Sequence, residues 1–137
     1  MTDDLLTALS RRVVIADGAT GTMLQAHDLS LDDFEGHEGC NEVLNVTRPD
    51  VVRSLHEAFF DVGVDAVETN TFGANLANLA EYGIQSRIRE LAQAGAQIAA
   101  DTARGLQHQR PPAICPRFRR SRHQTPHTGP RTLRGLA

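Results

Sequence analysis

The sequence has 137 residues, a formal net charge of −3 and two cysteines. Two cysteines are too few for a disulfide framework or a zinc ribbon. The chain contains no run of 18 apolar residues, so we expect no membrane-spanning helix. Its first residues are polar and acidic and lack the apolar segment of a signal peptide, which predicts a cytoplasmic protein.

Charge is divided unevenly along the chain. All 17 acidic residues lie between Asp3 and Asp101, whereas the stretch from Arg110 onward holds arginines and no acid. This change predicts two units, a folded domain over residues 1–109 and a disordered tail over residues 110–137, rich in Arg and Pro.

The apolar pattern predicts strands that alternate with helices. Short apolar runs bounded by turn residues predict buried strands, and apolar residues three or four positions apart predict helices. In chain order, the predicted elements are a strand over 12–16, a helical turn over 20–25, a long loop over 28–45, a helix from 47 to 62, a strand over 65–69, and helices over 75–82 and 86–104.

The helix that begins near residue 47 has the clearest boundaries. Thr47 can cap it with Asp50 three residues later, Pro49 suits its first turn, and Gly63 can end it in the left-handed conformation. Its predicted apolar stripe consists of Val51, Leu55, Phe59 and Val62, and Val52 and Ala58 widen it. His56 lies outside this stripe, and we expect it to face solvent.

Strands that alternate with helices imply an α/β fold with a parallel sheet. In such folds ligands bind at the carboxyl ends of the strands. Asp17 and Gly18 follow the first predicted strand, and Asn70 and Thr71 follow the second. We therefore expect these four residues at one edge of the sheet, with Glu68 on the same face as Asn70.

Several motifs in this order carry a family resemblance. They are DGATGTMLQ over 17–25, GCNE over 39–42, the helix of 49–59 with GVD over 63–65, and ETNTFG over 68–73. Together they resemble the homocysteine-binding domain of cobalamin-dependent methionine synthases. The resemblance implies a (βα)8 TIM barrel, of which this chain can form only the N-terminal portion, because a whole barrel needs roughly 250 residues.

The resemblance also implies a reaction. In this family a zinc ion binds homocysteine and deprotonates its thiol, and the thiolate accepts a methyl group from methylcobalamin held by other domains. The zinc ligands are three cysteines of late barrel strands, which Cys40 and Cys115 do not match. We therefore expect neither a catalytic residue nor a zinc or cobalamin site in this chain, and we expect it to be inactive alone.

The resemblance assigns the remaining substrate contacts to the two strand ends. Asp17 is the candidate for the ammonium group of homocysteine, Gly18 permits close backbone approach, and Asn70 and Thr71 line the neighbouring rim. The residues alone leave other interpretations open. Asp17 can be a turn residue that bonds its own backbone, Asn70 and Thr71 can be caps, and Glu68 can be a structural carboxylate inside the barrel.

The predicted loop over 28–45 and its flank hold several metal-ligand residue types. These are His27, Glu35, His37, Glu38 and Cys40. No pair among them has a regular ligand spacing on a helix, and a mobile loop holds ligands poorly. We therefore expect no metal site there.

Two interpretations of the tail stay open. Arg117 and Phe118 fit the start of the family's third strand, but the basic run over 119–122 breaks the pattern. A frameshift in a G+C-rich gene would produce such a composition, truncating the domain. Alternatively, the arginines could bind nucleic acid through its phosphates, although interleaved aromatic residues and a known fold motif are lacking.

Two strands cannot close a barrel, and the second would keep an unpaired edge. We therefore expect a marginally stable chain that self-associates through this edge. Three functional hypotheses follow: an inactive relative of the homocysteine domain, a stand-alone homocysteine-binding or split-barrel partner module, and an Arg-rich nucleic-acid interaction protein.

Overall fold

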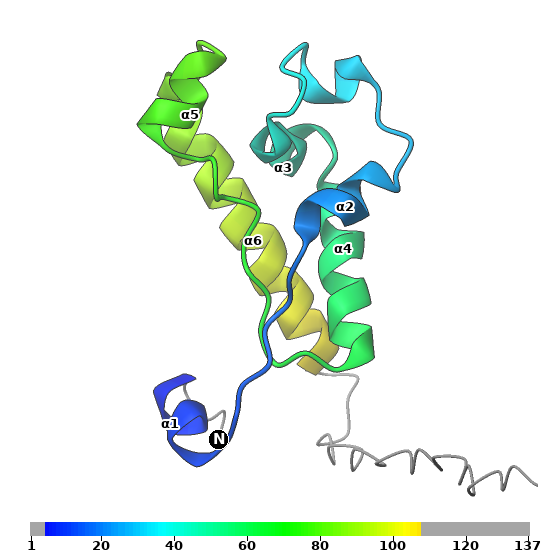
Figure 1. Ribbon diagram of the computed structural model, residues 1–137, viewed down its shortest axis with the longest axis vertical. Helices are drawn as coiled ribbons and strands as arrows, with labels where there is room; N and C mark the ends of the chain where they lie inside the picture. Colours follow the sequence, from blue (N-terminus) through cyan, green and yellow to red (C-terminus); the bar gives the residue numbers. More distant parts are fainter. Residues whose placement is uncertain (1–4, 108–137) are drawn as a thin grey trace, which may run out of the picture.

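The computed structural model describes residues 5–107. This part of the chain consists of helices joined by extended segments and short turns (Figure 1). The α-helices are α1 (Leu5–Arg11), α2 (Thr20–Gln25), α3 (Leu44–Thr47), α4 (Pro49–Val62), α5 (Leu76–Glu81) and α6 (Ile88–Gln107). Short 3-10 helices lie between them, namely η1 (Leu31–Phe34), η2 (Asn41–Val43) and η3 (Gln85–Arg87).

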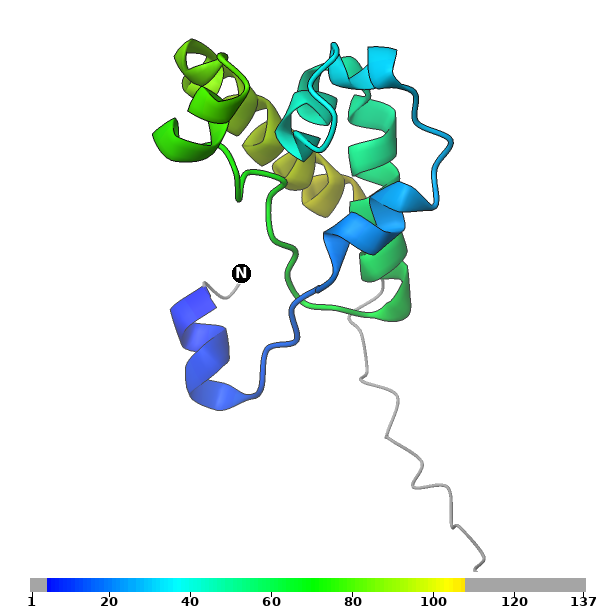
Figure 2. The same ribbon diagram turned by 45° about the horizontal axis from the view of Figure 1, so that its top comes forward.

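The core lies where α4 and α6, the two longest helices, pack against each other, with α2 and α3 in contact with α4 (Figure 1, Figure 2). Its buried side chains are Leu24, Leu44, Val51, Val52, Leu55 and Ile98. A second cluster joins the segment around η2 to α5 and α6, and contains Cys40, Val43, Leu79 and Leu91. Both clusters connect segments that are distant in the sequence.

The predicted α/β fold is wrong for residues 5–107, where no strand forms and helices predominate. The two predicted strands are extended segments that meet at an isolated parallel bridge between Ala16 and Ala66. Beside it, the Asp17 amide donates to Ala66 O at 3.1 Å. The pairing does not continue because the Asp65 carboxylate, rather than a main-chain carbonyl, accepts the Ile15 amide at 2.9 Å. The described residues therefore do not form the expected portion of a TIM barrel.

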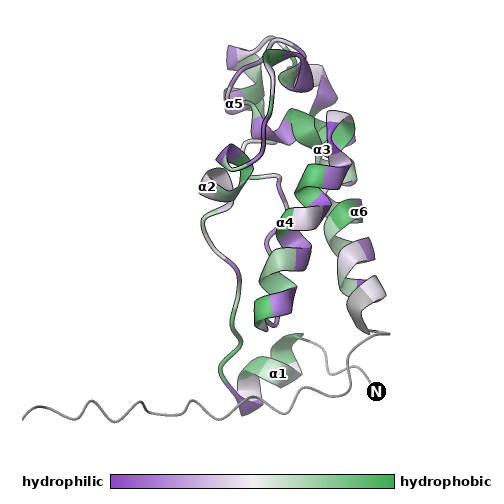
Figure 3. Cartoon of the chain, turned by 90° about the vertical axis from the view of Figure 1, so that its right-hand side faces the viewer, coloured by the Kyte–Doolittle hydropathy of each residue, from purple (hydrophilic) through white to green (hydrophobic). Residues whose placement is uncertain are grey.

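Helix α4 begins and ends where its sequence predicts. Pro49 occupies the first turn, and Gly63 ends the helix in the left-handed region with φ of 101°. Thr47 does not cap it, because its hydroxyl donates to the Asp33 carbonyl at 2.6 Å. Hydrophobic and hydrophilic residues alternate around α4 in Figure 3, as expected of a helix with one face in the core.

The buried face of α4 differs from the predicted stripe. His56, expected at the surface, is 0 % exposed, whereas Val62, expected in the core, is 80 % exposed. Val52 is buried as predicted, Ala58 is exposed, and Phe60 is buried although the stripe did not include it. Because Val52, His56 and Phe60 are spaced by four residues, they form one row along the helix, at the Val52 edge of the predicted stripe.

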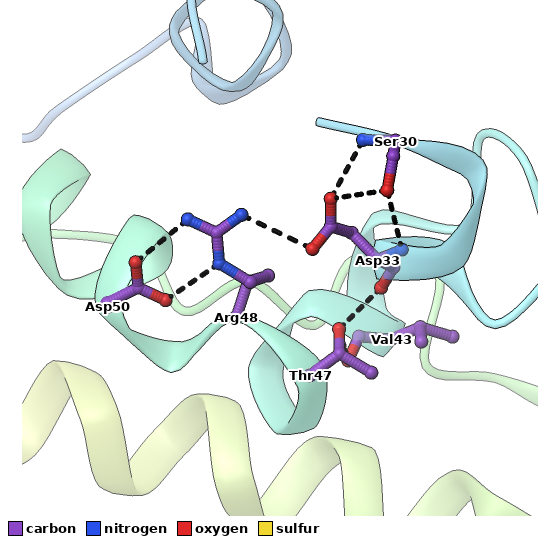
Figure 4. A network of polar contacts seen from close by, with 6 residues as sticks. All are labelled: Ser30, Asp33, Val43, Thr47, Arg48 and Asp50. Atoms are coloured by element: carbon purple, nitrogen blue, oxygen red, sulfur yellow. Dashed lines mark hydrogen bonds and ion pairs between the residues drawn. The ribbon is translucent and has the colours of Figure 1, made fainter. Parts of the chain in front are cut away.

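The segment predicted as a loop over 28–45 contains η1, η2 and the start of α3. Ser30 begins η1 with a capping box, in which the Asp33 carboxylate accepts the Ser30 amide at 2.8 Å. Arg48 links this cap to α4, since it donates to Asp33 at 3.2 Å and to Asp50 at 3.0 Å (Figure 4). These polar side chains hold the segment in place. Because the segment has no periodic apolar residues, its hydrophobic pattern alone predicted a loop.

The predicted helices over 75–82 and 86–104 are confirmed as α5 and α6. Asn75 caps α5, because its side-chain oxygen accepts the Asn78 amide at 3.0 Å. Helix α6 begins at Ile88, directly after η3, and continues to Gln107. The long amphipathic helix thus forms one side of the core.

The expected domain boundary at 109/110 lies outside the described residues. So do the predicted disorder of the tail, its frameshift and nucleic-acid interpretations, and Cys115. Within residues 5–107, none of the helices combines the length and the apolar character that a membrane span needs.

Candidate functional site

Asp17 lies directly after the bridge, at the start of the turn that leads to α2. Its Oδ1 accepts the Glu68 amide at 2.8 Å, so the carboxylate links the ends of the two extended segments. Its Oδ2 is buried and has no hydrogen-bond partner. Asp17 therefore bonds backbone that is distant in the sequence, which the interpretation as a self-contained turn residue does not predict.

Gly18 follows Asp17 in open surroundings. A Cβ atom built at Gly18 meets no other atom within 4 Å. A small ligand group can therefore approach the main chain beside the Asp17 carboxylate from this side.

Asn70 is held in place by its amide group. Its Nδ2 donates to Asn41 O at 2.8 Å and to Asn45 Oδ1 at 2.9 Å. Asn45 is buried, and its own Nδ2 donates back to Asn70 O at 2.8 Å. Since a side-chain amide has two N–H donors, both of those of Asn70 are engaged in joining its segment to η2 and α3.

Thr71 lies between a neighbouring hydroxyl and helix α6. Its Oγ1 is 2.6 Å from Thr69 Oγ1. A Cβ atom at Gly95 of α6 would lie 2.9 Å from Thr71 Cγ2 and 2.7 Å from Asn45 Nδ2. The absence of a side chain at Gly95 thus lets α6 approach the segment of Thr71.

The hydrogen bonds of the predicted site residues do not join them into one network among the described residues. Within the part of the chain that the structure describes, no hydrogen bond joins Asp17 to Asn70 or Thr71. Glu68 is exposed, which does not fit the alternative that it is a buried structural carboxylate. Glu68 contributes its main-chain amide to Asp17 instead.

Glu42 is a buried carboxylate whose role the sequence did not reveal. Its side chain is 8 % exposed, and its Oε1 accepts the Gly73 amide at 2.6 Å. The Cys40 thiol donates to Oε2 at 3.8 Å. A Cβ at Gly73 would lie 2.7 Å from Oε1, so glycine permits this contact. The GCNE motif is the sequence signal that could have pointed to it.

The residues around Cys40 do not fit a zinc ion. Burial, and then the charge of Glu42, raise the pKa of the Cys40 thiol. A cysteine that binds zinc must be deprotonated, which a raised pKa opposes. No group of three His, Cys, Asp or Glu side chains within residues 5–107 is placed to hold a metal ion.

Among the described residues, two open hollows adjoin the start of η2. The larger, of about 480 Å³, is lined by Gly21, Leu24, Gln25, His27, Leu29, Phe34, Gly39 and Asn41. The smaller, of about 200 Å³, is lined by Gly39, Cys40, Asn41, Glu42, Phe72, Gly73, Asn78, Leu79, Glu81 and Tyr82. Gly39 and Asn41 belong to both, whereas the Asp17 carboxylate lines neither hollow.

His56 of α4 is a further buried polar residue, which the sequence pattern placed in solvent. Both of its ring nitrogens are buried and have no hydrogen-bond partner. Burial lowers the pKa of the imidazole, and the charge of Asp17 opposes this effect in part. Because the net shift is downward from the ordinary value near 6.5, the ring is neutral at neutral pH.

A family model for homocysteine S-methyltransferase matches residues 14–118, a range that includes Asp17, Gly18, Asn70 and Thr71. The chain belongs to the homocysteine S-methyltransferase family. It is 61% identical over 100 residues to the methionine synthase of Mycobacterium tuberculosis and 56% identical over 100 residues to that of Mycobacterium leprae. Each alignment covers 73% of this chain and 8% of the relative. The resemblance inferred from the motifs is confirmed, and the chain spans a small part of these relatives' length.

Proposed function

We propose that this chain provides the part of a homocysteine S-methyltransferase that binds the amino-acid end of homocysteine. Family membership supports the choice of substrate. The observation that carries the proposal is the Asp17 carboxylate, which is anchored on the Glu68 amide at 2.8 Å and lies beside the open surroundings of Gly18.

In the proposed complex, the Asp17 carboxylate receives the ammonium group of homocysteine. Each carboxylate oxygen can accept more than one hydrogen bond, so the bond from the Glu68 amide leaves acceptor capacity on Oδ1. A hydrogen bond between charged groups contributes about 1.5–3 kcal/mol. This contact alone therefore changes affinity by roughly 10- to 150-fold.

Asn70 and Thr71 act at the other end of the amino acid in this proposal. Because the amide hydrogens of Asn70 are engaged with Asn41 and Asn45, its role is to hold the segment in place. The paired hydroxyls of Thr69 and Thr71 share one hydrogen bond. The second hydroxyl proton of the pair is then available to the carboxylate of homocysteine.

Activation of the thiol is not assigned to the described residues. The zinc ion that the family resemblance implies finds no matching ligands around Cys40, where burial favours the neutral thiol. We therefore assign substrate binding to this chain and no step of methyl transfer.

Isothermal titration calorimetry of the full chain with L-homocysteine tests the proposal. We expect saturable binding that weakens at least about tenfold in Asp17→Asn. We expect a similar loss for the wild type with 4-mercaptobutanoic acid, which lacks the amino group. Asp28→Asn, which removes an exposed carboxylate, is the matched control with unchanged affinity. Equal affinities of the wild type and Asp17→Asn for homocysteine would contradict the assignment.

A further inference from the structure

Buried polar atoms without a partner gather around Asp17 and His56. Among residues 5–107, the buried side-chain nitrogen and oxygen atoms that lack a hydrogen bond are Asp17 Oδ2 and the two ring nitrogens of His56. An unpaired buried group costs about 1–3 kcal/mol. Such groups are rare in native proteins, and each needs a physical reason.

The three atoms belong to one region of the fold. Asp17 leads directly into α2, and α2 packs on α4, the helix that carries His56. The charge of Asp17 reaches the imidazole and is the one charge with a resolved effect on it. Helix α2, with the sequence TGTMLQ, contributes no titratable side chain of its own. Asp17 is therefore the charged group with which His56 interacts in the described part of the chain.

The hydrogen-bonding capacities of the two side chains are complementary. A neutral imidazole has one N–H donor, and an ionised carboxylate has acceptors only. Asp17 Oδ1 already holds the Glu68 amide, so Oδ2 is the oxygen left for the imidazole. A carboxylate held at both oxygens cannot turn about its χ2 angle, and its remaining lone pairs keep one direction.

We propose that His56 is a positioning residue for Asp17, which donates its imidazole N–H to Oδ2 and fixes the carboxylate that receives the ammonium group of the substrate. Because His56 is 0 % exposed, it acts through Asp17 and does not touch the substrate. The inference rests on the proposed function of Asp17 in homocysteine binding.

The first test measures the imidazole itself. In full-length chain labelled with 15N-histidine, the ring nitrogen shifts give the pKa of His56 in the wild type and in Asp17→Asn. Since the charge of Asp17 raises this pKa, its removal is expected to lower the pKa of His56 below the wild-type value. The control Asp61→Asn removes an exposed carboxylate of α4 and leaves the value unchanged. An equal or higher pKa in Asp17→Asn overturns the proposal.

The second test is a double-mutant cycle on homocysteine affinity. His56→Leu removes the donor and is expected to weaken binding about fivefold or more in the wild type but little in Asp17→Asn. His56→Gln keeps an N–H donor and is expected to recover most of the loss. Equal fold-changes in both backgrounds, or a His56→Gln variant as weak as His56→Leu, overturn the proposal.

The two tests separate this inference from the proposed function. Absence of homocysteine binding in the wild type refutes the proposed function, while the pKa of His56 in Asp17→Asn still decides whether the two side chains interact. Urea unfolding of each variant verifies that it is folded. If His56→Leu does not fold, the pKa measurement and His56→Gln carry the test.

Discussion

Gly95→Ala tests how closely α6 packs against the segment of the candidate site. Gly95 is buried, and a Cβ there would lie 2.7 Å from Asn45 Nδ2 and 2.9 Å from Thr71 Cγ2. A real Cβ does not come so close to another atom, so a neighbour must move. Movement of Asn45 strains its hydrogen bonds to Asn70 O at 2.8 Å and Leu91 O at 3.1 Å.

The expected magnitude follows from these contacts. Overpacking by a methyl group costs about 1–3 kcal/mol, and each strained hydrogen bond contributes about 0.5–1.5 kcal/mol to stability. Alanine offsets about 1 kcal/mol of this cost, because it is the better helix former. The free energy of unfolding is therefore expected to fall by about 1–5 kcal/mol in Gly95→Ala, and the upper end applies if both hydrogen bonds of Asn45 are lost.

Gly105→Ala is the matched control, because Gly105 lies in the same helix and a Cβ there meets nothing within 4 Å. This variant is expected to gain up to about 1 kcal/mol. Urea denaturation followed by circular dichroism gives both midpoints and slopes. Equal midpoint shifts in the two variants, or a stabilised Gly95→Ala, would refute the packing of Asn45 and Thr71 against Gly95.

In Asp65→Asn, the free energy of unfolding is expected to depend less on pH in the acid range than it does in the wild type. The Arg12 guanidinium makes the largest contribution to lowering the pKa of Asp65, and the Ile15 amide the next. The ionised Asp65 carboxylate therefore stabilises the folded chain fully above its pKa in the unfolded chain, about 3.9. This stabilisation is lost as the pH falls through the lower pKa of Asp65 in the folded chain. Urea midpoints across this acid range measure the effect, and parallel curves for both proteins would contradict it. Cys40 is expected to resist Ellman's reagent at about pH 8 until the chain unfolds, because burial raises its pKa. The rate is measured in Cys115→Ser, and fast reaction of the native chain would contradict the burial.

Local signals in the sequence predicted α2, α4, α5 and α6, but not α1 or α3. Pro49 and Gly63 restrict the backbone itself, so they mark the ends of α4 whatever packs around it. The predicted strands over 12–16 and 65–69 were wrong, because an apolar run forms a strand only where a neighbouring segment offers main-chain groups along its length. The Ile15 carbonyl accepts the Asp65 and Ala66 amides, but the Ile15 amide donates to the Asp65 carboxylate, which no periodicity predicts.

The candidate site was predicted in part. Motifs identified the family, but whether Asp17 binds homocysteine stays a prediction. The burial of Glu42, Asn45 and His56 was not predicted, because a polar side chain is buried by partners distant in the sequence. Glu42 meets Gly73 and Asn45 meets Asn70, and neither pairing leaves a local pattern.

The two extended segments that meet at the bridge between Ala16 and Ala66 are expected to open more readily than the helices. Amides inside α4 and α6 are protected by helical hydrogen bonds and a shared core, so they exchange slowly with deuterium. The extended segments have few main-chain bonds and open locally at low free energy. The Glu68 amide lies in one of them and is closed by the Asp17 carboxylate alone. The exchange rate of the Glu68 amide therefore reports on the Asp17 side chain alone. A ligand that orders Asp17 is expected to slow the deuterium exchange of this one amide.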